Sequence, residues 1–167
     1  VTDLRTGGMA GGSGEQAQTT SLLNQMMRHY NLPNSSIAGA SDSNIPDYQA
    51  GYEKALTIAT SAQSGSNLIT QASGMLSGLM GVSLESFILD NELCGSVLSS
   101  MRSLEIQALA NDLESIKQVI VQDKHFLGEP DTLKRMNSDF NYPKSVKRIS
   151  PELWMQEKGN TMLNEAS

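Results

Sequence analysis

Cysteine, histidine and basic charge are scarce in this chain of 167 residues, and each shortage excludes a class of protein. The single cysteine, Cys94, cannot form a disulfide within the chain, so we expect a protein of the reducing cytoplasm. The 12 Lys and Arg face 18 Asp and Glu, and the resulting net charge of -6 excludes nucleic acid as the main partner. No apolar run approaches the roughly 18 residues of a membrane span, so we expect no membrane partner.

Signatures of metal, nucleophile and phosphate chemistry are also missing. The two histidines, His29 and His125, and the one cysteine show no metal-ligand spacing, so we expect no metal site. No GxSxG motif marks a nucleophile. The glycine-rich stretch 7–14 lacks the Gly-Lys-Ser/Thr ending of a P-loop and the GxGxxG spacing after a complete strand. We therefore interpret it as a mobile loop or lid.

Helix and strand patterns alternate along the first hundred residues. Apolar spacing predicts helices at 16–30, 48–64 and 84–101, and short runs predict strands at 35–40 and 67–71, with a loop at 74–81. This alternation indicates repeated βα units and a parallel sheet, hence an α/β fold. Residues 1–6 resemble the end of a strand, so we expect a C-terminal piece of a longer chain.

From residue 104 onward the pattern changes to helices alone, predicted at 109–122 and 132–140. A more basic tail follows from residue 141, and we expect it to cover the surface through Leu153 and Trp154. The length suits one ordinary domain. We therefore expect βα units over 1–103 and a helical extension of the same domain over 104–167.

The most informative run is 41–54, which places acids and an amide in a turn that leads into a helix. Asp42 directly follows a predicted strand, the position from which barrel enzymes reach their substrate. Asp47, Gln49 and Glu53 complete the best polar cluster of the chain. The alternative is that Asp47 only caps the helix and Glu53 lies in solvent.

Other polar residues have structural interpretations. His125 has apolar neighbours and is typical of a packed, hydrogen-bonded histidine, while His29 ends a helix, where a cation suits the helix dipole. Cys94 lies on the apolar face of a predicted helix and indicates core packing. Asp90 and Glu92, in the middle of that helix, are expected to face solvent or to pair with a neighbouring segment.

Short stretches in consistent order over residues 3–140 carry a resemblance to a known family. They are DLRTG at 3–7, GSGEQA at 12–17, HYNLP at 29–33, SDS at 41–43, PDYQAGYEK at 46–54, GSNLI at 65–69, SLE at 83–85, DNE at 90–92 and HFL at 125–127. Together they resemble the trimethylamine methyltransferase family, whose members demethylate trimethylamine or quaternary amines such as glycine betaine. The run 42–54 is the most specific part.

The resemblance implies a (βα)8 TIM-type barrel, of which this chain is the C-terminal half. It also implies methyl transfer from an amine nitrogen to the Co(I) of a corrinoid (cobalamin) that a cognate partner protein presents, with no cofactor bound directly. The full-length form is expected to be a homo-oligomer. In the family a pyrrolysine marks the members that act on trimethylamine, whereas members without it favour quaternary amines.

We expect catalytic roles for Asp42, Asp47, Gln49 and Glu53, and substrate or loop roles for Asp3, Arg5, Glu15 and Gln71. The leading hypothesis is a trimethylamine methyltransferase. One alternative is a member that demethylates a quaternary amine such as glycine betaine. Another is a catalytically incomplete half-barrel with a docking or structural role, whose open strand edges would pair with other chains. The last alternative is an unrelated α/β enzyme that uses the segment 42–53.

Overall fold

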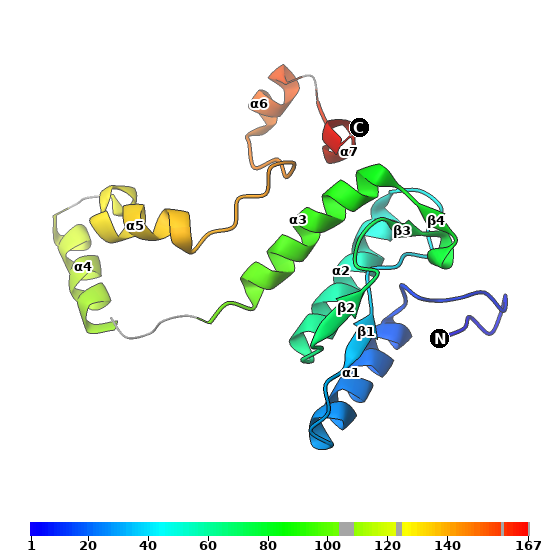
Figure 1. The fold of residues 1–167 in the computed structure, drawn as a ribbon. Coiled ribbons are helices and arrows are strands. Elements are labelled where there is room, and N and C mark those ends of the chain that lie inside the picture. The colour runs from blue at the N-terminus through cyan, green and yellow to red at the C-terminus, as the bar shows by residue number, and fades with distance from the viewer. Residues whose placement is uncertain (104–108, 123–124, 158, 167) are drawn as a thin grey trace. The chain divides into compact units, whose positions relative to one another are not determined.

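The computed structural model describes residues 1–103, 109–122, 125–157 and 159–166 and contains both helices and strands (Figure 1). In chain order the elements are α1 (Gly14–His29), β1 (Ser35–Ile37), α2 (Tyr48–Gln63), β2 (Leu68–Thr70), β3 (Met75–Leu76), the short 3-10 helix η1 (Ser77–Leu79), β4 (Gly81–Val82), α3 (Leu84–Ser100), α4 (Leu109–Val121), the 3-10 helix η2 (Phe126–Gly128), α5 (Pro130–Ser138), α6 (Pro151–Gln156) and α7 (Met162–Ala166). The predicted helices are confirmed, with ends that differ by at most two residues.

The chain forms two compact units. The first comprises Val1–Leu98 together with the chain from Pro143 onward, and the second is Ser99–Tyr142. Within the second unit, the Arg102 guanidinium donates to the Ser138 carbonyl at 2.9 Å. The domain organisation expected from the sequence stays a prediction. No helix in the described ranges is both long and apolar enough to cross a membrane.

A βαβ unit organises the first compact unit. β1 and β2 pair in parallel with Ser35 opposite Leu68 and Ile37 opposite Thr70, and α2 is part of the connection between them. The carboxyl ends of both strands therefore lie at one edge, where residues 41–47 and Gln71 follow. The predicted parallel pairing is confirmed here, whereas the larger barrel sheet stays a prediction.

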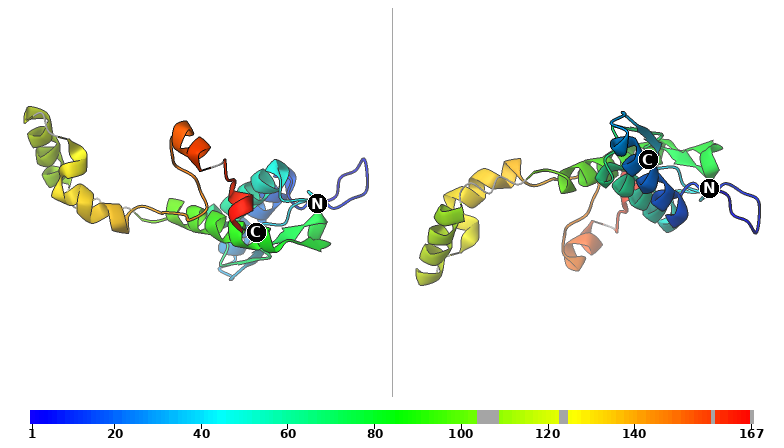
Figure 2. Two further views of the ribbon diagram at one scale, coloured as in Figure 1. Left: turned by 90° about the horizontal axis from the view of Figure 1, so that it is seen from above. Right: turned by 90° about the horizontal axis from the view of Figure 1, so that it is seen from below.

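Helices α1 and α2 lie side by side, as the view from below in Figure 2 shows. Each begins with a side-chain cap: the Ser13 hydroxyl accepts from the Gln16 N–H, and the Asp47 carboxylate accepts from the Ala50 N–H. At their other ends, Asn24 donates to the Ser64 hydroxyl at 2.7 Å. Polar contacts therefore join the two helices.

The buried faces of the helices are more polar than the apolar spacing suggests. On α2 the buried positions are Ala50, Glu53, Lys54, Thr57, Ile58 and Ser61, which recur at the helical period. Tyr52 and Leu56, which stand at the apolar spacing in the sequence, are instead 49% and 42% exposed. Ile58 joins Ala38 and Val97 in a small hydrophobic core.

Two predicted segments differ from the structure. The predicted loop 74–81 contains an antiparallel hairpin, in which Met75 pairs with Val82 and Leu76 with Gly81. The predicted strand end at 1–6 is wrong for the described chain, because residues 1–10 fold back on themselves. Thr2 and Met9 form an isolated antiparallel bridge, and a positive φ of 73° at Gly7 allows the reversal.

Candidate active site

The acidic loop, defined as residues 41–47, leaves the carboxyl end of β1 and enters α2. Its path is fixed first at Gly39, which has a φ of 87° and lies so close to Ala72 that a Cβ would stand 2.8 Å from the Ala72 Cα. Only glycine fits this approach. Its other end is fixed by Asp47, the N-cap of α2. The loop is thus held between a strand end and a helix start.

Glu53 lies at the centre of the site. Its side chain comes from the second turn of α2, and the residue is only 4% exposed. One carboxylate oxygen accepts from the Ser41 hydroxyl at 2.7 Å and the Asp42 N–H at 2.8 Å, and the other accepts from the Gln49 amide at 2.8 Å. The interpretation that Glu53 faces solvent is therefore wrong. In the described chain, the donors to this carboxylate are all neutral groups.

Asp42 is half-buried and ties the glycine-rich loop to the acidic loop. Its two carboxylate oxygens accept from the Gly11 N–H at 3.0 Å and the Gly12 N–H at 3.2 Å. These two N–H groups are therefore directed at a carboxylate of the protein itself. The glycines hold an acid in place, which sequence inspection did not reveal because the partners are about thirty residues apart.

Gly12→Ala is expected to lower the free energy of unfolding by about 1–3 kcal/mol, the usual effect of overpacking. The reason is that a Cβ at Gly12 would stand 2.5 Å from a Glu53 carboxylate oxygen. Gly51→Ala is the matched control on α2, where a Cβ meets nothing within 4 Å. The control should raise the same quantity by roughly 0.5–1 kcal/mol. Urea unfolding measures both, and equal effects of the two variants would contradict the packing.

Asp47 acts as a helix cap and stands at the edge of the site. It is exposed, accepts from the Ala50 N–H at 3.0 Å and from the Ser43 hydroxyl at 2.9 Å, and these bonds lower the pKa of Asp47. Because the folded-state pKa is the lower one, its stabilising effect is present above the unfolded pKa and is lost as the pH falls through the folded pKa. The capping interpretation is thus confirmed for Asp47.

Two tyrosines stand on the outer face of the same helix turns. The Tyr48 and Tyr52 rings are 5.7 Å apart between centroids and inclined by 49°, and Tyr48 is 87% exposed. Partial burial, and then the negative charge of Glu53, raise the pKa of Tyr52. Both rings therefore offer exposed aromatic faces on the helix that carries the Glu53 carboxylate.

The remaining predicted residues lie outside this group of contacts. Asp3 and Arg5 form an ion pair with each other at 2.8 Å, and the Arg5 side chain lowers the pKa of Asp3 to about 2. Glu15 is exposed in the first turn of α1. Gln71 follows β2 with a left-handed φ of 64° and is exposed. The structure thus brings together Asp42, Gln49 and Glu53, with Asp47 joined through Ser43.

A buried ion pair that the sequence did not assign lies directly beside Glu53. The Lys54 ammonium contacts the Asp90 carboxylate of α3 at 2.5 Å, and the two residues are 1% and 6% exposed. The same Asp90 oxygen accepts from the Gly74 N–H at 2.8 Å. Of the two alternatives for Asp90, pairing with a neighbouring segment is confirmed. The helical position of Asp90 and Lys54 was visible in the sequence, but their pairing was not.

The other singled-out residues have structural contacts. Glu92 accepts from the Lys144 and Ser145 N–H groups at 2.8 and 2.9 Å, which joins the tail to α3. The His125 ring accepts from the Leu127 N–H at 3.2 Å, but the residue is exposed, so the expected packing is wrong. Cys94 packs against the small core, and burial raises the pKa of its thiol. The described residues contain no group of three or more His, Cys, Asp or Glu arranged to hold a metal ion.

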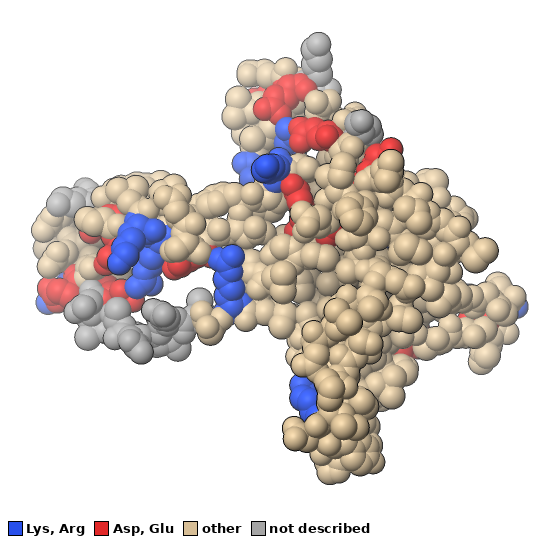
Figure 3. Space-filling model, viewed as in Figure 1, with Lys and Arg blue, Asp and Glu red and all other residues tan. Residues whose placement is uncertain are grey.

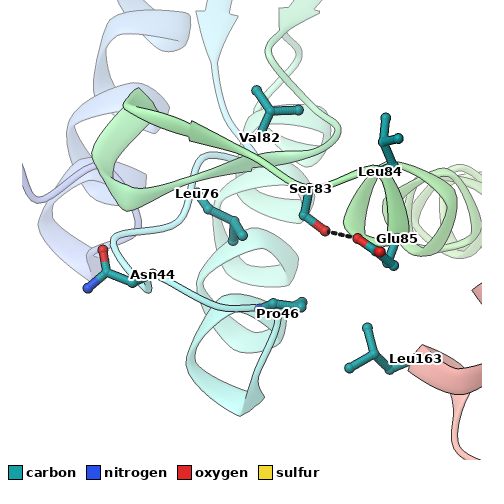
Figure 4. Close-up of a pocket in the computed structure, with 8 residues that line it drawn as sticks. All are labelled: Asn44, Pro46, Leu76, Val82, Ser83, Leu84, Glu85 and Leu163. Atoms are coloured by element: carbon teal, nitrogen blue, oxygen red, sulfur yellow. Dashed lines mark hydrogen bonds between the residues drawn. The ribbon is translucent and has the colours of Figure 1, made fainter. Parts of the chain in front are cut away.

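A pocket of about 560 Å³ adjoins the acidic loop (Figure 4). It is lined by Asn44, Pro46, Leu76, Val82, Ser83, Leu84, Glu85 and Leu163. Two of these lining residues are hydrogen-bonded to each other, since the Ser83 hydroxyl donates to the Glu85 carboxylate at 2.7 Å. On the face that Figure 3 shows, α1 and α2 carry few charged side chains. The carboxylates of Asp42 and Glu53 do not line this pocket.

A βαβ unit with carboxylates that follow a strand end is typical of α/β enzymes. The family model of trimethylamine methyltransferase (MTTB) matches residues 1–167, and the chain belongs to this family. It is 32% identical over 96% of its length to a glycine betaine methyltransferase of Desulfitobacterium hafniense (strain Y51), of which it covers 33%. It is 31% identical over 91% of its length to the trimethylamine methyltransferase MttB of Methanosarcina thermophila, of which it covers 30%. The chain therefore spans about a third of the length of these relatives.

Proposed function

We propose that this chain contributes the ammonium-binding side of a methyltransferase that acts on trimethylamine or a related methylamine. The observation that carries the proposal is the buried carboxylate of Glu53, whose described hydrogen-bond partners are all neutral. Asp42 adds a second carboxylate that accepts only from backbone N–H groups in the described chain. A negative site of this kind attracts and orients a positively charged amine.

The methyl acceptor in this proposal is the Co(I) of a corrinoid that a cognate protein carries. The cobalt supplies the electron pair of the new bond to carbon. The electrons of the broken C–N bond stay on nitrogen. The protonated form of trimethylamine, trimethylammonium, therefore leaves as neutral dimethylamine, and a quaternary amine leaves as the tertiary amine. The residues of this chain hold the nitrogen and fix the direction of the methyl group. Orientation and a fixed field are sufficient contributions for an in-line transfer.

The aromatic pair favours a second candidate, a quaternary amine such as glycine betaine. A quaternary nitrogen has no N–H to donate, so it is recognised by negative charge and aromatic faces. Tyr48 and Tyr52 offer two such faces on the helix that carries Glu53. One relative of this chain is named for that substrate.

We also propose that the βαβ unit belongs to a larger (βα)8 barrel and that the whole protein forms a homo-oligomer. The parallel pairing of β1 with β2 and the acidic loop at their carboxyl edge support the barrel. In such a barrel the acidic loop would stand at the mouth, where a separate corrinoid protein has access.

The assay uses the protein as its gene encodes it, with a corrinoid protein reduced to Co(I). Trimethylamine and glycine betaine are supplied in parallel, and methylation of cobalt is followed by absorbance. Methyl transfer from trimethylamine supports the leading proposal, and transfer only from glycine betaine supports the second candidate. No absorbance change with either amine would contradict both.

A further inference from the structure

The β3–β4 hairpin holds the acidic loop through backbone hydrogen bonds. The Ser77 N–H donates to the Ser43 carbonyl at 2.8 Å, and the Gly78 N–H donates to the Ser41 carbonyl at 2.9 Å. Ser41 is the residue whose hydroxyl binds Glu53. A shift of the hairpin would therefore move a direct partner of the buried carboxylate.

The turn of this hairpin has an unfavourable backbone conformation. Ser77 and Leu79 have φ values of 52° and 75°, in the left-handed region that residues with a Cβ disfavour. Between them, Gly78 has a φ of 58°. Such a turn persists only where surrounding contacts hold it in place.

One contact at the base of the hairpin comes from the buried ion pair. Gly74, the residue before β3, donates its N–H to Asp90 at 2.8 Å, and Asp90 is paired with Lys54. Lys54 directly follows Glu53 on α2. The pair therefore connects α3, the hairpin base and the helix that carries the central carboxylate.

We propose that Asp90 is a positioning residue of the methyl-transfer site. Its carboxylate holds the Gly74 N–H and with it the strained hairpin, which in turn fixes Ser41 and Ser43 around Glu53. Lys54 compensates the buried charge of Asp90. This inference rests on the proposed function. It gives α3, through Asp90, a role in the position of Ser41 and Ser43.

The test compares two double variants in the protein as its gene encodes it. Lys54→Met/Asp90→Asn removes both charges but keeps an oxygen that accepts from Gly74, whereas Lys54→Met/Asp90→Leu removes the acceptor with a side chain of similar shape. Both avoid an unpaired buried charge, so both are expected to fold. Circular dichroism and thermal unfolding check that they do.

Amide hydrogen exchange is the readout that needs no substrate. The Leu variant should exchange faster than the Asn variant in peptides covering 74–82 and 41–47, with equal exchange in α4. With the amine that the parent protein uses, kcat/KM should fall about 10–100-fold in the Leu variant, the usual effect of misplaced groups, and stay near the parent value in the Asn variant.

Equal exchange and equal kcat/KM in the two double variants would overturn the proposal. The acceptor for the Gly74 N–H would then have no effect on the hairpin, the acidic loop or the reaction. If the parent protein transfers no methyl group, the proposed function fails. The exchange comparison then still decides whether Asp90 holds the hairpin and the acidic loop. Faster exchange confined to 74–82 would also overturn the proposal, since the acidic loop would then be independent.

Discussion

Lys54→Met is expected to lower the free energy of unfolding by about 3–5 kcal/mol, the typical result of removing one partner of a buried ion pair. The substitution leaves the Asp90 carboxylate in a site where it is only 6% exposed, with the Gly74 N–H as its remaining described donor. Urea unfolding of the protein as its gene encodes it, followed by circular dichroism, measures the change.

Two controls accompany this variant. Lys134→Met changes the same residue type on exposed α5 and should alter the free energy of unfolding by less than about 0.5 kcal/mol. Lys54→Met/Asp90→Leu should recover most of the loss, because neither charge remains buried. If Lys54→Met and Lys134→Met had the same small effect, the ion pair would not be the stabilising contact that the structure shows.

Glu53→Gln is expected to reduce kcat/KM for the amine about 100-fold, an effect of the size seen when one preorganised electrostatic contact is lost. The glutamine has nearly the same shape, so the change removes the buried negative charge and little volume. It also replaces one carboxylate oxygen by an NH2 group, which cannot accept a hydrogen bond. The present donors are the Ser41 hydroxyl and the Asp42 N–H on one oxygen and the Gln49 amide on the other. Initial rates over a range of amine concentrations measure the loss.

Two further variants separate charge from packing in that experiment. Glu114→Gln removes an exposed carboxylate of α4 and should leave kcat/KM unchanged. Ser41→Ala removes one donor to Glu53 but keeps the charge, so its effect should be smaller than that of Glu53→Gln. A Glu53→Gln protein that is folded and retains full kcat/KM would show that the buried charge does not assist the reaction.

The positions of the helices could be predicted because their signals are local. Ser13 and Asp47 are capping residues that precede helical patterns, and both cap in the structure. The βα alternation was predictable for the same reason. The hairpin at 75–82 was missed because glycine-rich sequence predicts a loop, and its strands are only two residues long.

The polar centre of the site could be predicted only in part, because burial of a charge depends on distant partners. The sequence did not decide whether Glu53 belongs to the site or faces solvent, because its donor Ser41 lies 12 residues away. Lys54 and Asp90 are 36 residues apart, so no local pattern links them. Asp42 lies in the loop after β1, as predicted, because an acid that follows a strand is a local signal, although β1 ends at Ile37, earlier than the predicted strand. Its catalytic role stays a prediction.

The polar interior has a thermal consequence. Hydroxyl and amide side chains such as Asn24, Ser36, Ser41, Thr57 and Ser61 fill sites that apolar groups usually occupy. Exposure of apolar surface raises the heat capacity on unfolding, and exposure of polar surface lowers it. Opening this part of the chain therefore changes the heat capacity little for its size. The free energy of unfolding then curves less with temperature than it would for an apolar core of the same size.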